Sequence, residues 1–462
     1  MTRPLDSVLA QLEADFQPAV ERLRQLLRFP SIGTDRAYRE PTRKAAEWLA
    51  AELRSIDFDA SLRDTAGQPM VVAQHPGPDG AHGPHILYYG HYDVQPPEPL
   101  EPWRSPPFEP AIVEAERGPR LVARGAVDDK GQLMTWLEAL RAWHGVHGAP
   151  PVRVSVFLEG EEESGSPSLE PFLAAHRDEL AADVCVISDT NMWDVDTPAV
   201  CTSLRGLLYV ELTLSGPSHD LHSGLFGGAV PNPLNVLTRV LGELHDERGR
   251  VQIPGFYDDV REVGGGALAK LAFDEARFLA SAGLTRPVGE AGYSTLERIW
   301  ARPTCDINGI WGGYIGEGSK TVIPARGSAK LSCRLVPDQD PAKILDGLRA
   351  FLDARTPPDC HFEVTSMSAT PAIRVPTGSP FLAAAERALE RVFDRPPLRI
   401  GMGGSIPAVE AIRRLLGMES LLVGFGLDDD RVHSPNEKFE LACFERGMRA
   451  HAAMLAEFAK LA

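Results

Sequence analysis

Histidine and acidic side chains recur in five short segments of the chain. They are His91 and Asp93; Asp128 and Asp129; Glu161, Glu162 and Glu163; Asp189; and His433. Imidazole and carboxylate groups are common ligands of zinc, and of manganese where oxygen ligands dominate. The same groups serve as general acids and bases. These residue types therefore indicate a metal-dependent reaction.

Each of the five segments follows a predicted strand. The strands are short apolar runs at 86–89, 121–124, 152–158, 184–187 and 421–425. Ligands of open α/β sheets bind at the carboxyl ends of strands, so we expect the segments to converge on one sheet. One metal ion needs only three or four protein ligands, and the surplus predicts two ions about 3.5–4 Å apart with a bridging carboxylate. One carboxylate then remains as a general base.

Each segment alone also fits an ordinary structural role. Asp128 and Asp129 could cap a helix, and the three glutamates could form a solvated acidic loop. Asp189 and His433 could be turn residues. The joint interpretation is favoured because all five segments would otherwise follow strands of one sheet by chance.

The elements that must position these groups alternate between strand and helix. Helical patterns run over 5–29, from Pro41 through Leu53, and over 130–143. In these patterns apolar residues recur every three or four positions. Together with the strands they predict an α/β unit with a mostly parallel sheet.

The middle of the chain follows a different order. Strands are predicted at 207–214, 307–314, 330–336 and 361–365, and helices at 232–244 and 341–352. This order indicates a separate α+β unit inserted into the α/β unit, with domains at 1–204, 205–370 and 371–462. Residues 257–302 are expected to be mostly helical.

Composition narrows the class of protein. The 462 residues carry a formal net charge of −17, which disfavours binding to nucleic acid or anionic membranes. Six well-separated cysteines without a CxxC motif indicate free thiols in a reducing compartment. We see no signal peptide and no run of 18 apolar residues, so we expect a cytoplasmic protein.

Longer motifs surround the candidate ligands. Four of them are Gly90-His-Tyr-Asp-Val-Gln-Pro96, Gly125-Ala-Val-Asp-Asp-Lys-Gly131, Glu159-Gly-Glu-Glu-Glu-Ser-Gly165 and Ser188-Asp-Thr190. They resemble the dinuclear-zinc peptidase family of aminoacylases, glutamate carboxypeptidases, succinyl-diaminopimelate desuccinylases and dipeptidases. Four more, which resemble the cytosolic nonspecific (carnosine-type) dipeptidase branch, are Asp220-Leu-His-Ser-Gly224, Lys320-Thr-Val-Ile-Pro324, Arg334-Leu-Val-Pro337 and Gly403-Gly-Ser-Ile-Pro407. The resemblance covers nearly the whole chain.

The resemblance implies a fold and a metal centre. The fold is a mostly parallel-sheet zinc-peptidase catalytic domain with an inserted α+β (ferredoxin-like) lid/dimerisation domain. Two divalent ions per chain, Zn²⁺ or alternatively Mn²⁺, would be bridged by Asp128, whose peptide bond to Asp129 is expected to be cis. The remaining ligands would be His91 and Asp189 for one ion, and Glu163 and His433 for the other.

The resemblance also implies catalytic roles. Glu162 would be the general base, and Asp93 would orient His91 through its second ring nitrogen. Three consecutive glutamates leave the register of base and ligand open by one, and Ser164-Gly165 favours Glu162 and Glu163.

Further residues would bind the substrate. Arg334 would bind its carboxylate, with Gly404 and Ser405 as additional donors. His222 would stabilise the oxyanion and, with Thr321, would act on the partner subunit's site in a homodimer.

The leading function is hydrolysis of dipeptides or short peptides by a hydroxide that bridges two metal ions, with Glu162 as general base. An N-acyl-amino-acid deacylase or a carboxypeptidase of the same family is the alternative. A catalytically silent scaffold would have lost a ligand or the base, and none is lost here.

Overall fold

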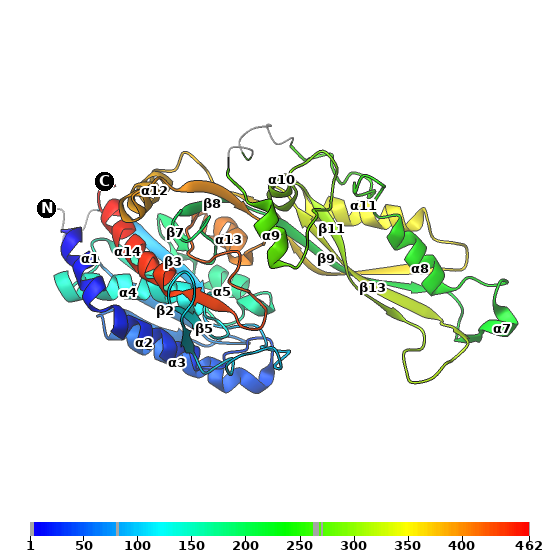
Figure 1. Cartoon of the computed structure of the whole chain (residues 1–462), viewed down its shortest axis with the longest axis horizontal. Coiled ribbons are helices and arrows are strands. Elements are labelled where there is room, and N and C mark those ends of the chain that lie inside the picture. Colours follow the sequence, from blue (N-terminus) through cyan, green and yellow to red (C-terminus); the bar gives the residue numbers. More distant parts are fainter. Residues whose placement is uncertain (1–3, 80–82, 262–267, 269–270, 462) are drawn as a thin grey trace. The chain divides into compact units, whose positions relative to one another are not determined.

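The computed structural model describes residues 4–79, 83–261, 268 and 271–461, and the chain forms two compact units (Figure 1). The first unit comprises Met1–Thr202, Val375–Ile400 and Pro407–Ala462. The second comprises Ser203–Arg374 and Gly401–Ile406. The chain therefore passes from the first unit into the second twice, at Ser203 and again at Gly401.

A nine-stranded sheet lies at the centre of the first unit. Its four middle strands are parallel: β6 (Arg153–Glu159), β3 (His85–His91), β7 (Val184–Ile187) and β17 (Ser420–Leu422). The sheet is completed by β1 (Asp59–Arg63), β2 (Met70–His75), β8 (Ala199–Leu204), β15 (Ile373–Arg374) and β16 (Leu398–Met402). Every residue of β3 and β7 is buried, as apolar strands covered on both faces require. The predicted α/β class with a mostly parallel sheet is confirmed.

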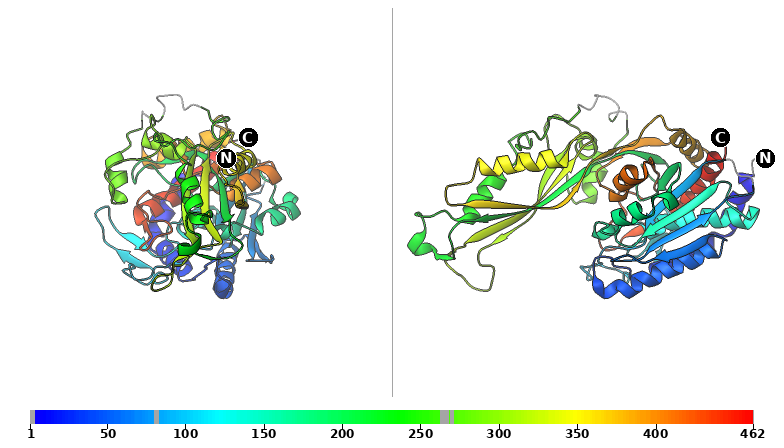
Figure 2. Two further views of the ribbon diagram at one scale, coloured as in Figure 1. Left: turned by 90° about the vertical axis from the view of Figure 1, so that its right-hand side faces the viewer. Right: turned by 180° about the vertical axis from the view of Figure 1, so that it is seen from behind.

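Helices lie on both faces of this sheet (Figure 2). They are α1 (Leu5–Ala14), α2 (Phe16–Leu27), α3 (Arg39–Arg54), α4 (Lys130–His147), α5 (Leu169–Ala175), α6 (Arg177–Leu180), α12 (Pro380–Phe393), α13 (Pro407–Ala411), α14 (Leu441–Phe458) and short turns at Arg36–Tyr38, Glu162–Ser164 and Ile412–Leu416. The single helix predicted over 5–29 is divided at Asp15. Tyr88 stacks on Trp136 of α4 with centroids 4.7 Å apart, which fixes α4 against β3. No helix in the described ranges is long and apolar enough to cross a membrane.

Strand β5 (Arg120–Val122) is not part of the central sheet. It pairs antiparallel with β4 (Ala111–Val113) and β18 (Lys438–Glu440) in a separate three-stranded sheet. The expectation that Asp128 follows a strand of the same sheet as the other four segments is therefore wrong. A three-residue strand carries too short a pattern to reveal its partner, and Asp128 instead lies in the loop before α4.

The second unit is built on an antiparallel sheet in the order β11-β13-β9-β14. These strands are β9 (Gly206–Ser215), β11 (Thr304–Gly312), β13 (Arg326–Leu335) and β14 (His361–Thr370). Alternate residues of β9 are buried, and the apolar side chains of α8 (Pro233–Gly242) and α11 (Pro341–Asp353) join the same core. The other elements are β10 (Leu221–His222), α7 (Ser223–Phe226), α9 (Glu275–Ser281), α10 (Thr295–Trp300) and β12 (Val322–Ile323).

The region 257–302 contains much less helix than the sequence predicted. Only α9 and α10 are α-helices among its described residues, and 262–267 and 269–270 lie outside them. Gly283, Gly289 and Gly292 all have positive φ values of 71°, 118° and 93°, which interrupt helical backbone. The expectation of a mostly helical region is wrong for the part that the structure describes.

Candidate active site

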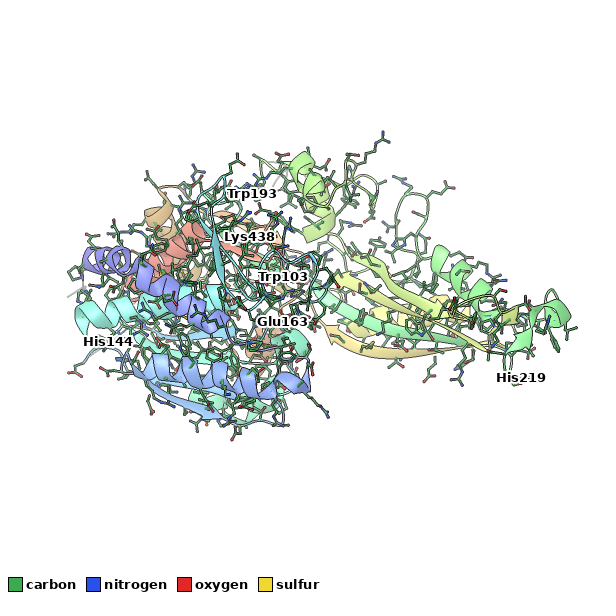
Figure 3. The ribbon with its side chains drawn as sticks, turned by 60° about the horizontal axis from the view of Figure 1, so that its bottom comes forward. Trp103, His144, Glu163, Trp193, His219 and Lys438 are labelled. Atoms are coloured by element: carbon green, nitrogen blue, oxygen red, sulfur yellow. The ribbon has the colours of Figure 1, made fainter. Side chains whose placement is uncertain are left out.

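Two groups of three potential metal ligands lie in the first unit and share one carboxylate. One group is His91, Asp128 and Asp189, and the other is Asp128, Glu163 and His433. Within each group the ligand atoms all lie within 4.8 Å of one another. The structure thus brings together all five side chains that the sequence analysis had assigned to metals. Glu163 is labelled among the side chains of this unit in Figure 3.

The distances within the two groups match the spacing of ligands around a metal ion. His91 Nε2 lies 3.2 Å from Asp128 Oδ1 and 3.9 Å from Asp189 Oδ2. His433 Nε2 lies 3.0 Å from Asp128 Oδ2 and 3.2 Å from Glu163 Oε2. Around a tetrahedral ion with bonds near 2.0–2.1 Å, neighbouring ligand atoms are about 3.3–3.4 Å apart. Asp128 offers a different oxygen to each group, which suits a bridging ligand.

The ring of His91 provides an independent test of whether a cation fits. Its Nε2 is buried and makes no hydrogen bond of good geometry among the described residues, although it lies 3.2 Å from Asp128 Oδ1. A buried polar atom without a partner is costly in a folded protein. A cation placed between this atom and the oxygens of Asp128 and Asp189 would satisfy it, so these residues fit a metal ion.

The carboxylates of the cluster conflict electrostatically with one another. Burial, followed by the charge of Asp128, raises the pKa of Asp189 to about 7. Burial also acts to raise the pKa of Asp128, but a hydrogen bond from His433 and the positive charge of the neighbouring His91 bring it below its usual range. The hydrogen bonds to Asp128 and Glu163 raise the pKa of His433 to about 10. Bound cations would stabilise the ionised carboxylates and resolve this conflict.

Within the glutamate run, each side chain has a different environment. Glu163 belongs to the second ligand group and also accepts a 2.8 Å hydrogen bond from Gln95. Glu161 is buried against Gly67, where an added Cβ would lie only 1.6 Å from its Oε1. Glu162 has no side-chain hydrogen bond or ion pair within the described ranges, and burial raises its pKa well above the usual range.

Asp93 is fully buried and holds the glutamate run in place. Its carboxylate accepts the backbone N–H of Glu162 at 3.2 Å and of Glu163 at 3.1 Å. His91 Nδ1 lies 3.1 Å from the Asp93 carbonyl oxygen and 3.4 Å from Oδ1. The resemblance implied only the contact with His91. The two backbone bonds were missed because no sequence pattern marks them.

Two further buried residues support the ligands. Asp129 accepts the His91 N–H at 3.1 Å, and its peptide bond to Asp128 is cis, as expected. His451, to which no role was assigned, lies 3.0 Å from Ser188 Oγ and 3.0 Å from Thr135 Oγ1. It thereby fixes the turn that carries Asp189 from within the core.

A second set of candidate residues lies in the second unit. Arg334 Nη1 donates to Ser405 Oγ at 3.1 Å, and the Ser405 hydroxyl donates to the Arg205 carbonyl at 2.5 Å. Arg205 Nε donates in turn to the Gly403 carbonyl at 3.1 Å. Gly403 and Gly404 lie in this loop. Arg334 has no carboxylate within ion-pair distance among the described residues, so its guanidinium is available to an anion.

Arg205 was not recognised from the sequence. Burial, then the charge of Arg334, lowers its pKa to about 10. An added Cβ at Gly403 would lie 3.0 Å from Arg205 Nη2 and 3.0 Å from the Ile299 carbonyl. This close approach explains why residue 403 is a glycine. The Gly403-Gly404 pair beside Ser405 was the one sequence feature that pointed to a close contact in this loop.

His222 and Thr321 lie together in the second unit. The Ser223 N–H donates to the Thr321 carbonyl at 3.0 Å, and β10 pairs with β12. His222 is exposed, and its Nδ1 accepts the Gly224 N–H at 3.0 Å. Its Nε2 has no partner within the described ranges. His219 is the competing histidine of this loop (Figure 3), and its Nδ1 lies 3.0 Å from Ser218 Oγ.

Comparisons with known proteins agree with the motifs. Residues 87–457 match the model of peptidase family M20/M25/M40. The chain is 30% identical over 480 residues to the Cys-Gly metallodipeptidase DUG1 of Candida albicans, covering 99% of this chain and 97% of the relative. It is 30% identical over 466 residues to the Beta-Ala-His dipeptidase of Homo sapiens, covering 97% and 88%. The solved M20 metallo-carboxypeptidase Sso-CP2 from Sulfolobus solfataricus superposes with a TM-score of 0.84 at 30% identity, covering 96% and 99%. The family predicted from the motifs is confirmed, and the chain belongs to peptidase family M20/M25/M40.

Proposed function

We propose that this protein hydrolyses dipeptides or short peptides with the help of two divalent cations. The observation that carries the proposal is the pair of ligand groups that share Asp128. The carboxylate of Glu162 belongs to neither group. The relatives named Cys-Gly metallodipeptidase and Beta-Ala-His dipeptidase support dipeptides as the substrate class.

In this proposal Asp128 bridges the two cations. His91 and Asp189 complete one site, and Glu163 and His433 complete the other. Zn²⁺ suits a set of histidine and carboxylate ligands, and Mn²⁺ is the alternative. Bound there, the cations would polarise the scissile carbonyl and lower the pKa of a water molecule between them.

Glu162 is the proposed general base. It would take a proton from the attacking water and return it to the leaving amine. Its pKa, raised by burial in the cation-free site, would fall beside two positive charges, so the carboxylate would be ionised at neutral pH. Asp93 would hold the Glu162 side chain in position, because its carboxylate accepts the backbone N–H groups of both Glu162 and Glu163.

Arg334 is the proposed ligand of the substrate's C-terminal carboxylate. Its guanidinium is oriented by Ser405, and it has no carboxylate within ion-pair distance among the described residues. Gly404 and Ser405 would add donors to the same carboxylate. This arrangement favours short peptides with a free C-terminus.

We further propose that residues 205–370 form a lid and dimerisation domain of ferredoxin-like type. His222 and Thr321 would complete the partner subunit's site in a homodimer, with His222 stabilising the oxyanion. Two observations support a partner: His222 is exposed, and so are the neighbouring apolar side chains of Leu225 (77%) and Phe226 (41%).

A substrate panel on protein reconstituted with Zn²⁺ or Mn²⁺ tests the function. We expect hydrolysis of free dipeptides such as Cys-Gly and β-Ala-His, and much slower hydrolysis of C-terminally amidated and N-acylated dipeptides. The similarity to the carboxypeptidase Sso-CP2 favours one rival. Faster hydrolysis of N-acyl amino acids or N-blocked peptides would establish a deacylase or carboxypeptidase instead.

A further inference from the structure

Glu437 is a fully buried carboxylate, four residues after His433, that binds the loop of Asp128. Its Oε2 accepts hydrogen bonds from Arg124 Nη1 at 2.8 Å and from the Gly125 N–H at 2.9 Å. Its Oε1 accepts the N–H groups of Val127 at 2.9 Å and Asp128 at 3.1 Å. Four donors use the full accepting capacity of one carboxylate, so Glu437 has no lone pair left for a metal ion.

These bonds restrict the backbone from which the shared ligand projects. Within the loop the Ala126 N–H donates to the Ala123 carbonyl at 3.3 Å, and the Ala123 N–H donates to the backbone carbonyl of Glu437 at 3.1 Å. Loops tied by several bonds to one residue have few alternative conformations. A displacement of this loop would move the Asp128 side chain relative to the other ligands of both groups at once.

The chain between His433 and Glu437 is held at a second point. Asn436 Oδ1 accepts the Arg104 N–H at 2.8 Å, and its Nδ2 donates to the Pro102 carbonyl at 2.8 Å. His433 itself has a φ of 58°, an uncommon conformation for a residue with a side chain. Surrounding bonds must therefore maintain the conformation of this segment.

We propose that Glu437 is a positioning residue for both cations. It holds the 125–128 loop so that Asp128 presents one oxygen to each ligand group, and its hydrogen bonds join that loop to the segment of His433, to which Glu437 itself belongs. The inference rests on the proposed metal-dependent function, because it assigns Glu437 its effect through Asp128 and His433.

The variant Glu437→Gln tests this role with little change in volume. The new amide group would place its NH₂ against two N–H donors, so half of the four bonds would be lost. We expect the dissociation constants for Zn²⁺ to be ~10–100-fold larger at both sites, as measured by competition with a chromophoric chelator. Two ions should still bind at saturation.

Glu290→Gln is the matched control. Glu290 is a buried carboxylate of the second unit that accepts two 2.8 Å bonds from Arg302 and one 3.0 Å bond from Arg250. Both glutamine variants should lower the melting temperature of the metal-free protein. Only Glu437→Gln should weaken Zn²⁺ binding, which separates positioning of the ligands from a general loss of stability.

A second variant keeps the test decisive if Glu437→Gln does not fold. Glu437→Asp retains a charge for Arg124 but withdraws the carboxylate from the backbone amides by one methylene. It should also bind Zn²⁺ more weakly than the wild type. Wild-type Zn²⁺ dissociation constants in the folded variants would overturn the inference while leaving the proposed function intact. A wild-type protein that binds no Zn²⁺ would instead refute the proposed function.

Discussion

The two units hold their candidate catalytic residues in different ways. In the first unit four of the five proposed ligand side chains are largely buried, with exposed fractions from 0% for His91 to 18% for Asp189, and His433 is 52% exposed. Each of them contacts at least one other ligand. In the second unit His222 is exposed and makes one local side-chain hydrogen bond, and Arg334 makes one to Ser405. The first unit therefore presents complete ligand groups, whereas the second presents separate groups that need a substrate or a partner to act.

The largest expected effect separates the two roles within the glutamate run. Glu162→Ala should lower kcat by at least ~10²-fold while metal content stays near that of the wild type, because Glu162 is a proposed base and not a ligand. Glu163→Ala should lose metal, because Glu163 belongs to a ligand group. Steady-state kinetics and elemental analysis measure both quantities.

Glu161→Gln is the control for this pair, because Glu161 is buried against Gly67 and outside both ligand groups. It should keep metal content and most of kcat. If Glu162→Ala loses metal and Glu163→Ala keeps it, the assignment of base and ligand is shifted by one residue.

Arg334 tests whether the second unit recognises the substrate's carboxylate. Arg334→Ala should cost roughly 2–4 kcal/mol in kcat/KM for free dipeptides, because a charge-assisted, bidentate pair is lost. C-terminally amidated dipeptides should already be poor substrates of the wild type and should be little affected by the change. Equal losses on free and amidated substrates would contradict carboxylate recognition.

Mixing two inactive variants tests whether the second unit acts on its partner. His222→Ala and Glu162→Ala should each be nearly inactive alone. After subunit exchange, half of the dimers are mixed, and each holds one site with both residues intact. About a quarter of wild-type activity should then return.

Mass spectrometry of the mixture is the control for subunit exchange. If His222 serves its own chain, no site in the mixture is complete, and activity stays at the level of the single variants. That outcome, with exchange verified, would remove the shared site.

The smallest expected effect concerns His451 and is measured as a change in stability with pH. Burial lowers its pKa to about 3, whereas an unfolded histidine titrates near 6.5. Between these values the unfolded chain binds a proton that the folded chain does not, so the free energy of unfolding decreases as pH falls. This contribution should cost the wild type roughly 2 kcal/mol between pH 6.5 and 4.5.

Urea unfolding of the metal-free wild type and of His451→Gln over this pH range measures the contribution. The variant should lose less stability with acid than the wild type does. His361→Gln, an exposed position on β14, should follow the wild type. Equal acid sensitivity of the wild type and His451→Gln would show that His451 is protonated in the folded state.

Much of the first unit could be predicted from local sequence. Buried apolar runs identified β3, β6 and β7, and polar residues shortly after them identified His91, the run Glu161–Glu163 and Asp189 as candidate ligands. This works because parallel strands present their carboxyl ends at one edge of the sheet. Strand order and residue type therefore predict these candidates, whereas the choice of Glu163 and the division of the ligands between two ions came from the family resemblance.

Other features depend on contacts between distant segments, which no local pattern contains. The burial of Glu437 could not be predicted, because a charged residue after Ser-Pro-Asn gives no sign of burial. The pairing of β5 with β18 joins residues more than 300 positions apart. Region 257–302 contains less helix than predicted because Gly283, Gly289 and Gly292 adopt positive φ values, which the apolar pattern does not reveal.

Metal titration of the metal-free protein tests the central claim most directly. Zn²⁺ or Mn²⁺ is added in known equivalents, and bound metal and hydrolysis of a free dipeptide are measured on the same samples. We expect about two ions bound per chain at saturation, activity that reaches its maximum only with the second, and complete loss of activity with a chelator. Full activity of a metal-free preparation would contradict the account.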